Sequence, residues 1–194
     1  MKTLKMTLVS FAILLGATAY AQDGRIAPFA PSNLVRISPL ALLKSKVKFH
    51  YERSFSPHFS AGAVGSAFYG MYRGFRVEPF ARCYFKATAP EGFYGQGRIH
   101  FSWAAASGEM MINSMSATTN VGFSEYGASF DVGYQAVFGK KDNFVFDSYI
   151  GYRYSSLSSL KDEMLTDGLD VAKQGFRTLH ANAFDLGISF GYKF

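Results

Sequence analysis

Large apolar residues alternate with small or polar residues along several segments of the chain, at the period of two that indicates β-strands. In the segment Ala183 to Phe194, the residues opposite the apolar face are all small or polar. Segments 75–86 and 125–138 show the same alternation. The apolar face of the first segment consists of Phe184, Leu186, Ile188, Phe190, Tyr192 and Phe194.

Eight segments of this kind predict an antiparallel sheet whose even strand number puts both ends of the chain on one side. The connections after the second, fourth and sixth segments are short, and the two longest connections, 105–119 and 155–180, fall on the other side. Within the last connection, 160–165 and 169–173 are each predicted to form a helical turn or two. The eight segments are residues 33–43, 46–55, 59–69, 75–86, 93–104, 120–138, 144–156 and 181–194.

Alternation alone fits two architectures, a soluble β-sandwich and a transmembrane β-barrel. The apolar faces are rich in aromatic residues, which make up 17% of the chain, and the polar faces carry glycine and charges of both signs. Such a polar face suits a crowded interior better than a solvated surface. We therefore predict an all-β fold, an eight-stranded antiparallel transmembrane β-barrel of the bacterial outer-membrane type.

The first 21 residues have the pattern of an export signal. Lys2 and Lys5 precede the apolar run 8–15, and the small-residue site Ala19-Tyr20-Ala21 follows. An uncleaved anchor is the alternative, but the apolar run is shorter than the roughly 20 residues that a spanning helix needs. We predict cleavage between Ala21 and Gln22, so that residues 1–21 form a signal peptide and 22–194 the barrel domain.

Charge and cysteine content exclude several classes of function. The net charge of +6 includes two signal lysines and is not gathered in basic runs, so the sequence gives no support for nucleic-acid binding. The single cysteine, Cys83, cannot form an internal disulfide. No set of His, Cys, Asp and Glu has metal-ligand spacing, and Gly95-Gln96-Gly97 lies within a strand. We expect no metal and no cofactor.

The interior of an eight-stranded barrel is just wide enough for side chains to fill it. Buried charges are costly unless they are paired, so the inward charges should interlock. We interpret them as a structural plug; a gated pore and a proton relay are the alternatives. The charged residues predicted to face the interior are Glu52, Arg76, Glu78, Arg82, Arg98, Glu125, Asp131, Asp147, Arg153 and Asp185.

His100-Phe101-Ser102 is the one arrangement that resembles a catalytic pair, because residues two apart on a strand share a face. It is similar to the H-x-S pair that lipid A deacylase barrels use on their membrane side. The alternation instead turns His100 and Ser102 inward. A carboxylate partner, Glu109 or Glu125, is not fixed by the sequence.

Aromatic residues at the strand ends predict girdles at the two membrane interfaces. The terminal Phe194 predicts the signal that the barrel-assembly machinery reads on a last strand. The predicted girdle residues are Tyr69, Tyr72, Phe93, Trp103, Tyr126, Phe138, Phe144, Tyr154 and Phe194.

Three segments carry a family resemblance. Residues 74–85, followed by Pro90-Glu91-Gly92-Phe93-Tyr94, resemble the strand-turn-strand of a small outer-membrane barrel family catalogued as a domain of unknown function, whose strand reads near Q-P-E-x-R-Y-Y/W-F. Segments 127–141 and 150–154 are similar to its penultimate hairpin. Here Glu78 precedes Pro79 instead of following it, which moves the carboxylate to the other face. The resemblance implies an outer-membrane barrel and transfers no active site.

We therefore expect a non-enzymatic outer-membrane barrel, similar to small OmpA/OmpX-type barrels, that contributes to envelope integrity or surface contact. The expected partners are outer-membrane lipids and lipopolysaccharide, the assembly machinery, and a surface partner reached through 105–119 and 155–180; we expect a monomer. A lipid-modifying acyl hydrolase or transferase that uses His100 and Ser102 is one alternative function, and a narrow pore is another.

Overall fold

The computed structural model describes residues 29–70, 72–86, 89–112, 115–159 and 184–194, and only the backbone at 106–112, 115–121, 123 and 157–159. The predicted signal peptide and the predicted helical turns at 160–165 and 169–173 lie outside these residues. Among the described residues, no helix is long and apolar enough to cross a membrane.

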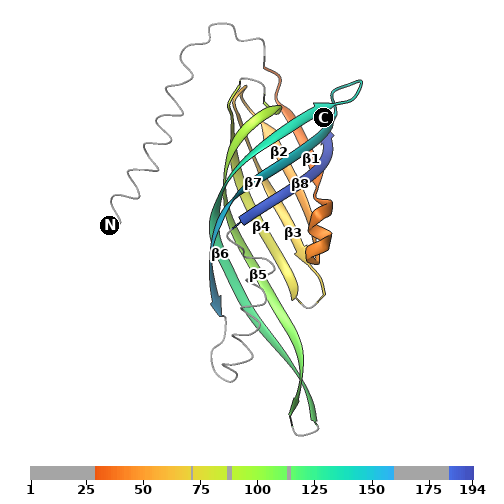
Figure 1. The fold of residues 1–194 in the computed structure, drawn as a ribbon, viewed down its shortest axis with the longest axis vertical. Helices are drawn as coiled ribbons and strands as arrows, with labels where there is room; N and C mark the ends of the chain where they lie inside the picture. Colours follow the sequence, from red (N-terminus) through yellow and green to blue (C-terminus); the bar gives the residue numbers. More distant parts are fainter. Residues whose placement is uncertain (1–28, 71, 87–88, 113–114, 160–183) are drawn as a thin grey trace, which may run out of the picture. The chain divides into compact units, whose positions relative to one another are not determined.

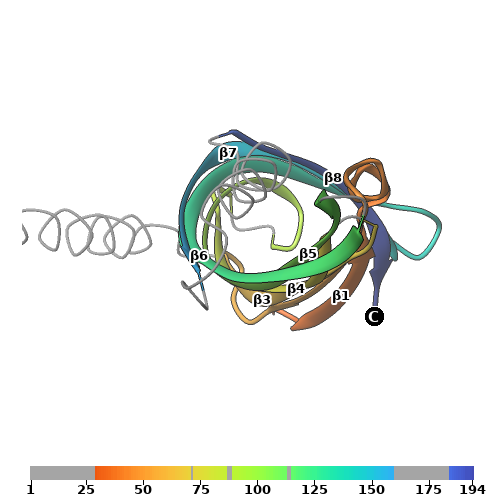
Figure 2. The same ribbon diagram turned by 90° about the horizontal axis from the view of Figure 1, so that it is seen from below.

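Eight antiparallel strands close into a barrel, which confirms the predicted fold (Figures 1 and 2). Each strand pairs with the next, and β8 closes the ring by pairing with β1 from Leu34↔Lys193 to Ile37↔Phe190. A 3₁₀ helix, η1, lies between β1 and β2. The elements are β1 (Ser32–Ile37), η1 (Pro39–Lys44), β2 (Lys46–Ser54), β3 (Phe59–Phe68), β4 (Tyr72–Tyr84), β5 (Gly92–Ile112), β6 (Met115–Phe138), β7 (Phe144–Ser159) and β8 (Phe184–Lys193).

The barrel has apolar side chains outside and polar ones inside. On β5, Phe101 and Trp103 are 51% and 39% exposed, whereas the intervening Ser102 is 1% exposed. The same alternation holds on β4, where Val77 is exposed and Glu78 is buried. We call the barrel interior the lumen, the end with the β2–β3, β4–β5 and β6–β7 connections the turn end, and the opposite end the loop end.

The first strand is shorter than predicted. The alternation suggested a strand over 33–43, but β1 ends at Ile37 and η1 follows. Pro39 occupies the first turn of η1, where its fixed φ and missing N–H are tolerated. Ser45 ends the helix in the left-handed region, with φ 49°, and leads directly into β2.

The region 105–119 was predicted as a loop, and this is wrong. β5 and β6 continue to pair through it, from Ala105↔Gly122 to Ile112↔Met115. The polar and small residues there were interpreted as loop signals, but Thr118 and Thr119 are β-branched residues that favour strands. β7 likewise extends to Ser159, into the predicted loop 155–180.

The β4–β5 connection folds against the turn end of the lumen. The Ala89 N–H donates to the Pro57 carbonyl at 2.8 Å. The Gln135 side-chain amide donates from inside the barrel to the carbonyl of the buried Pro90 at 2.5 Å. Tyr84 and Tyr94, which flank this connection, have no solvent exposure. The turn end of the lumen is therefore filled by protein.

Candidate functional site

The lumen holds a network of ion pairs that runs the length of the barrel. Every one of the charged residues predicted to face inward lies in it, and each forms at least one ion pair. These residues are Glu52, Arg76, Glu78, Arg82, Arg98, Glu125, Asp131, Asp147, Arg153 and Asp185.

At the turn end, Arg82 is the centre of the network. Its guanidinium contacts Glu52 at 2.9 Å and Asp147 at 3.2 Å. The hydroxyl groups of Tyr84 and Tyr94 donate to these two carboxylates at 2.8 and 2.6 Å. The Arg82 guanidinium also lies 4.1 Å from the centre of the Tyr94 ring. Each carboxylate here has both a cation and a phenol, the arrangement that offsets the cost of burying charge.

In the middle of the barrel, Arg98 joins three carboxylates. Its guanidinium contacts Asp131 at 2.8 Å and Glu78 at 2.9 Å, and it also pairs with Asp185. Arg153 joins two of the same groups, Asp185 at 2.6 Å and Glu78 at 3.3 Å. The pairs connect β4, β5, β6, β7 and β8, so they tie strands together across the lumen as well as along the wall.

Toward the loop end, Glu125 accepts hydrogen bonds from two sides. It pairs with Arg76, and the Ser102 hydroxyl donates to it at 2.8 Å. The His100 Nε2 atom lies 3.4 Å from Glu125 and 3.0 Å from the Ser155 hydroxyl. The structure thus places Glu125 beside His100 and Ser102; the side chain of Glu109 is outside its description.

This cluster has the residue types of a hydrolytic triad but a different connectivity. In a triad the serine hydroxyl bonds to one ring nitrogen of the histidine, and the carboxylate orients the other. Here the Ser102 hydroxyl bonds to the carboxylate itself, and one nitrogen of His100 faces both Glu125 and Ser155. His100 and Ser102 are 4% and 1% exposed and point into the lumen. The geometry suits a hydrogen-bonded structural cluster.

Several lumenal residues were not predicted. Arg36 bonds to Glu52 at 2.6 Å and to Gln135, and it lies between the outward Val35 and Ile37. That alternation was a usable signal. Lys46 and Lys48 were left out as well. Because only charged residues were proposed as site residues, the list also omitted neutral lumenal groups, namely Gln96, Gln135, Tyr84, Tyr94 and Tyr149.

Each described carboxylate of the lumen forms an ion pair with at least one arginine. Among the described residues, no group of three or more His, Cys, Asp or Glu is arranged to hold a metal ion. The network is therefore a set of ion pairs, with each carboxylate held by at least one guanidinium.

One predicted girdle residue is placed elsewhere. Tyr72 is 5% exposed and points inward, because β4 begins at Tyr72 and its even-numbered residues face the lumen. The predicted strand began at residue 75, so the alternation was not extended back to Tyr72, and the face on which Tyr72 lies was not predicted. The remaining predicted girdle residues are exposed: Tyr69, Phe93, Trp103, Tyr126, Phe138, Phe144, Tyr154 and Phe194.

No protein-family model and no curated protein sequence matches the chain. Among solved structures, the N-terminal β-barrel domain of Pseudomonas aeruginosa OprF aligns with a TM-score of 0.40 and 10% identity, over 84% of this chain and 97% of that one. Acinetobacter baumannii CarO2 aligns with a TM-score of 0.38 and 10% identity, over 87% and 99%. Membership of the family that residues 74–85 resemble remains a prediction, and the assignment of an eight-stranded barrel rests on the strand pairing of the chain itself.

Proposed function

We propose that this chain is an integral β-barrel of the bacterial outer membrane that acts without catalysis, in envelope integrity or surface contact. The observation that carries the proposal is the inverted distribution of its residues. Arginines and carboxylates are buried, while large apolar side chains cover the outside. A water-soluble protein would have the reverse arrangement, whereas a transmembrane barrel needs this one.

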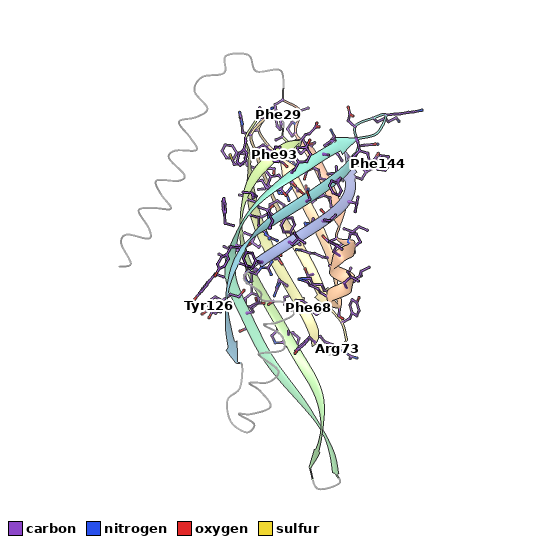
Figure 3. The ribbon with its side chains drawn as sticks, viewed as in Figure 1. Phe29, Phe68, Arg73, Phe93, Tyr126 and Phe144 are labelled. Carbon is purple, nitrogen blue, oxygen red and sulfur yellow. The ribbon has the colours of Figure 1, made fainter. Side chains whose placement is uncertain are left out.

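The outer surface has the features that a bilayer requires. The sheet is closed, so its strands satisfy their backbone hydrogen bonds without an open edge. Exposed aromatic residues gather at both ends of the wall, with Phe93 and Phe144 near the turn end and Tyr126 toward the loop end (Figure 3). This spacing supports the two predicted girdles.

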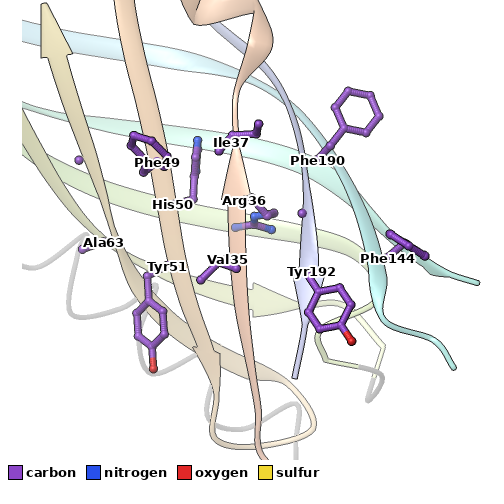
Figure 4. A pocket seen from close by; sticks show the side chains of 12 residues that line it. Val35, Arg36, Ile37, Phe49, His50, Tyr51, Ala63, Phe144, Phe190 and Tyr192 are labelled. Carbon is purple, nitrogen blue, oxygen red and sulfur yellow. The ribbon is translucent and has the colours of Figure 1, made fainter.

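A groove of about 790 Å³ runs over the outside of the barrel, from the start of β7 across β8, β1 and β2 to β3. Small residues, including Ala63 and Gly191, form part of its lining, and the aromatic rings of Phe49, Phe190 and Tyr192 project around it (Figure 4). A surface of this kind would be a liability in water, but the acyl chains of lipids can fill it.

The packing of the lumen favours a plug over the alternative of a pore. Arg82, Arg98 and Arg153 reach across the interior to carboxylates on other strands, and the β4–β5 connection covers the turn end. The lumenal position of His100 and Ser102 gives no support to the alternative of a lipid-modifying enzyme, whose nucleophile must reach an acyl chain. The proposed partners are lipids and lipopolysaccharide, the assembly machinery that would read Phe194, and a surface partner at the loop end.

Planar-bilayer recording tests the plug. We expect the refolded protein to produce no steady single-channel steps, because paired charges fill the lumen. Heat-dependent gel mobility should verify folding in the same sample, and membrane fractionation of cells should place the chain in the outer membrane. Phospholipids and lipid A incubated with the protein should be recovered unchanged. Regular conductance steps, or loss of an acyl chain that the substitution His100→Ala abolishes, would contradict the proposal.

A further inference from the structure

Two lysines of the lumen lie outside the close ion pairs of the network, and Glu78 and Asp185 are the carboxylates that act on the Lys48 ammonium from beyond ion-pair distance. Lys46 and Lys48 both point inward from β2 and are 9% and 5% exposed. The Lys48 ammonium donates to the Tyr149 hydroxyl at 2.9 Å, a neutral partner. Among the described residues, neither lysine forms an ion pair with a carboxylate; the carboxylates of the lumen pair with arginines and His100.

The count of charged side chains in the lumen also indicates that the lysines lack a full set of counter-charges. In the described part of the lumen, five arginines and two lysines face six carboxylates, so one positive charge is in excess. Around Lys46 the imbalance is larger. The charged side chains that act on its ammonium are the cations Lys48, Arg76 and Arg153 and the single carboxylate Glu78. A buried ammonium in such surroundings needs a counter-charge.

An unused hydroxyl lies beside these lysines. The Ser66 Oγ atom is buried and has no hydrogen-bond partner among the residues that the structure describes. Ser66 is directly opposite Lys48 on β2 and opposite Arg76 on β4, and all three side chains face the lumen. Lys46 is two residues from Lys48, about 7 Å along the same face of β2. An ammonium has three protons to donate, so Lys46, Lys48 and Ser66 together offer several uncommitted donors.

Water would satisfy these donors but would leave the excess charge uncompensated. An anion satisfies both. The barrel wall separates lumenal side chains from the bilayer, so the anion is a solute and not a lipid headgroup. It enters from the loop end, since the Gln135 and Pro90 contact belongs to the filled turn end.

From this geometry we infer that Lys46, Lys48 and Ser66 form a binding site for one small inorganic anion of the phosphate class in the loop-end half of the lumen. The site is independent of whether the barrel contacts a surface partner. It adds a solute-binding property to a lumen that is otherwise closed by its own ion pairs.

Equilibrium dialysis with radiolabelled inorganic phosphate tests the site. The refolded full chain is held in a non-ionic detergent, which contributes no phosphate, at constant ionic strength with gluconate as the balancing anion. We expect saturable binding of one phosphate per folded barrel. Lys46→Gln should weaken binding at least tenfold. Ser66→Ala, which keeps every charge, should weaken it several-fold.

Lys44→Gln is the matched control, because Lys44 lies two residues before Lys46 but is exposed on η1. It should bind phosphate as the wild type does. If Lys46→Gln does not fold, Ser66→Ala carries the test. Absence of saturable binding by the wild type would overturn the inference, and so would equal loss in Lys44→Gln and Lys46→Gln, or wild-type affinity in Ser66→Ala.

Discussion

At the scale of single residues, the pairing of the lumenal charges follows from the geometry of the closed sheet. Arg82 and Arg98 both face the lumen, from the neighbouring strands β4 and β5, yet they pair with different aspartates. In the structure Asp147 belongs to Arg82, and Asp131 and Asp185 belong to Arg98. The partners depend on the tilt and stagger of the closed sheet, which bring side chains from distant strands to one level. Period-two patterning carries no information about that level.

Removing Arg98 should destabilise the barrel strongly. Arg98→Met leaves Asp131 without an ion-pair partner among the described residues and weakens the pairing of Glu78 and Asp185. Breaking a buried pair in this way costs about 3–5 kcal/mol of unfolding free energy. Urea unfolding of the refolded protein in lipid vesicles, followed by tryptophan fluorescence, measures the change.

Arg73→Met is the control for this substitution. Arg73 also lies on the wall, on β4, but it is exposed near the loop end (Figure 3). Its removal should change the unfolding free energy by no more than about 0.5 kcal/mol. Equal effects of the two substitutions would show that the lumenal pairs do not stabilise the fold.

At the scale of elements, the strands were predicted well in their middles and poorly at their ends. Alternation is a strong signal where residues such as Phe130 and Asp131 face opposite media. The alternation weakens beyond the barrel, where β5 and β6 pair only with each other in the described part of the chain.

The sequence also showed that some residues on the lumenal faces are small, but it did not show why they are small. Gly187 lies directly opposite Tyr149 and Gly133 opposite Tyr94, so each tyrosine packs over a glycine of the next strand.

A methyl group at one of these glycines should disturb the packing. A Cβ atom at position 187 would lie 2.2 Å from the Tyr149 ring. We expect Gly187→Ala to lower the unfolding free energy by about 1–3 kcal/mol, the usual cost of overpacking. Gly97→Ala is the matched change, because nothing lies within 4 Å of its added Cβ. It should be neutral or stabilise by up to about 1 kcal/mol. The same urea titration compares them, and a similar loss at both positions would argue against the tyrosine–glycine packing.

The far end of the β5–β6 hairpin should be dispensable for folding. Pairing of β4 with β5 begins at Ala106, and pairing of β6 with β7 begins at Phe123. In the part of the chain that the structure describes, residues 107–112 and 115–120 therefore pair only within the hairpin. A two-stranded hairpin contributes little stability by itself. Replacing 107–120 with Asn-Gly should leave the heat-dependent gel shift intact and the unfolding free energy within about 1 kcal/mol. Failure of this variant to refold would mean that the hairpin contributes to the barrel.

At the scale of the whole molecule, the sequence was sufficient to predict the architecture because one physical contrast runs through every strand. Apolar and aromatic residues face out, and charges and glycines face in, so strand number, closure and polarity are mutually consistent. The pairing of charges inside the lumen was harder to predict from the sequence. Lys46 and Lys48 are ordinary inward positions in the alternation, and only the structure shows that, among the described residues, no carboxylate lies within ion-pair distance of either ammonium.

The most direct test of the account uses Trp103, the one tryptophan of the chain. Its side chain is 39% exposed on the outer wall toward the loop end. The protein is refolded into vesicles of phosphatidylcholine brominated near the headgroup, and its fluorescence is compared with that in unbrominated vesicles. We predict strong quenching by the brominated lipid and weak quenching by iodide in the aqueous phase. Strong iodide quenching with no effect of the brominated lipid would contradict a membrane-spanning barrel with its apolar face outward.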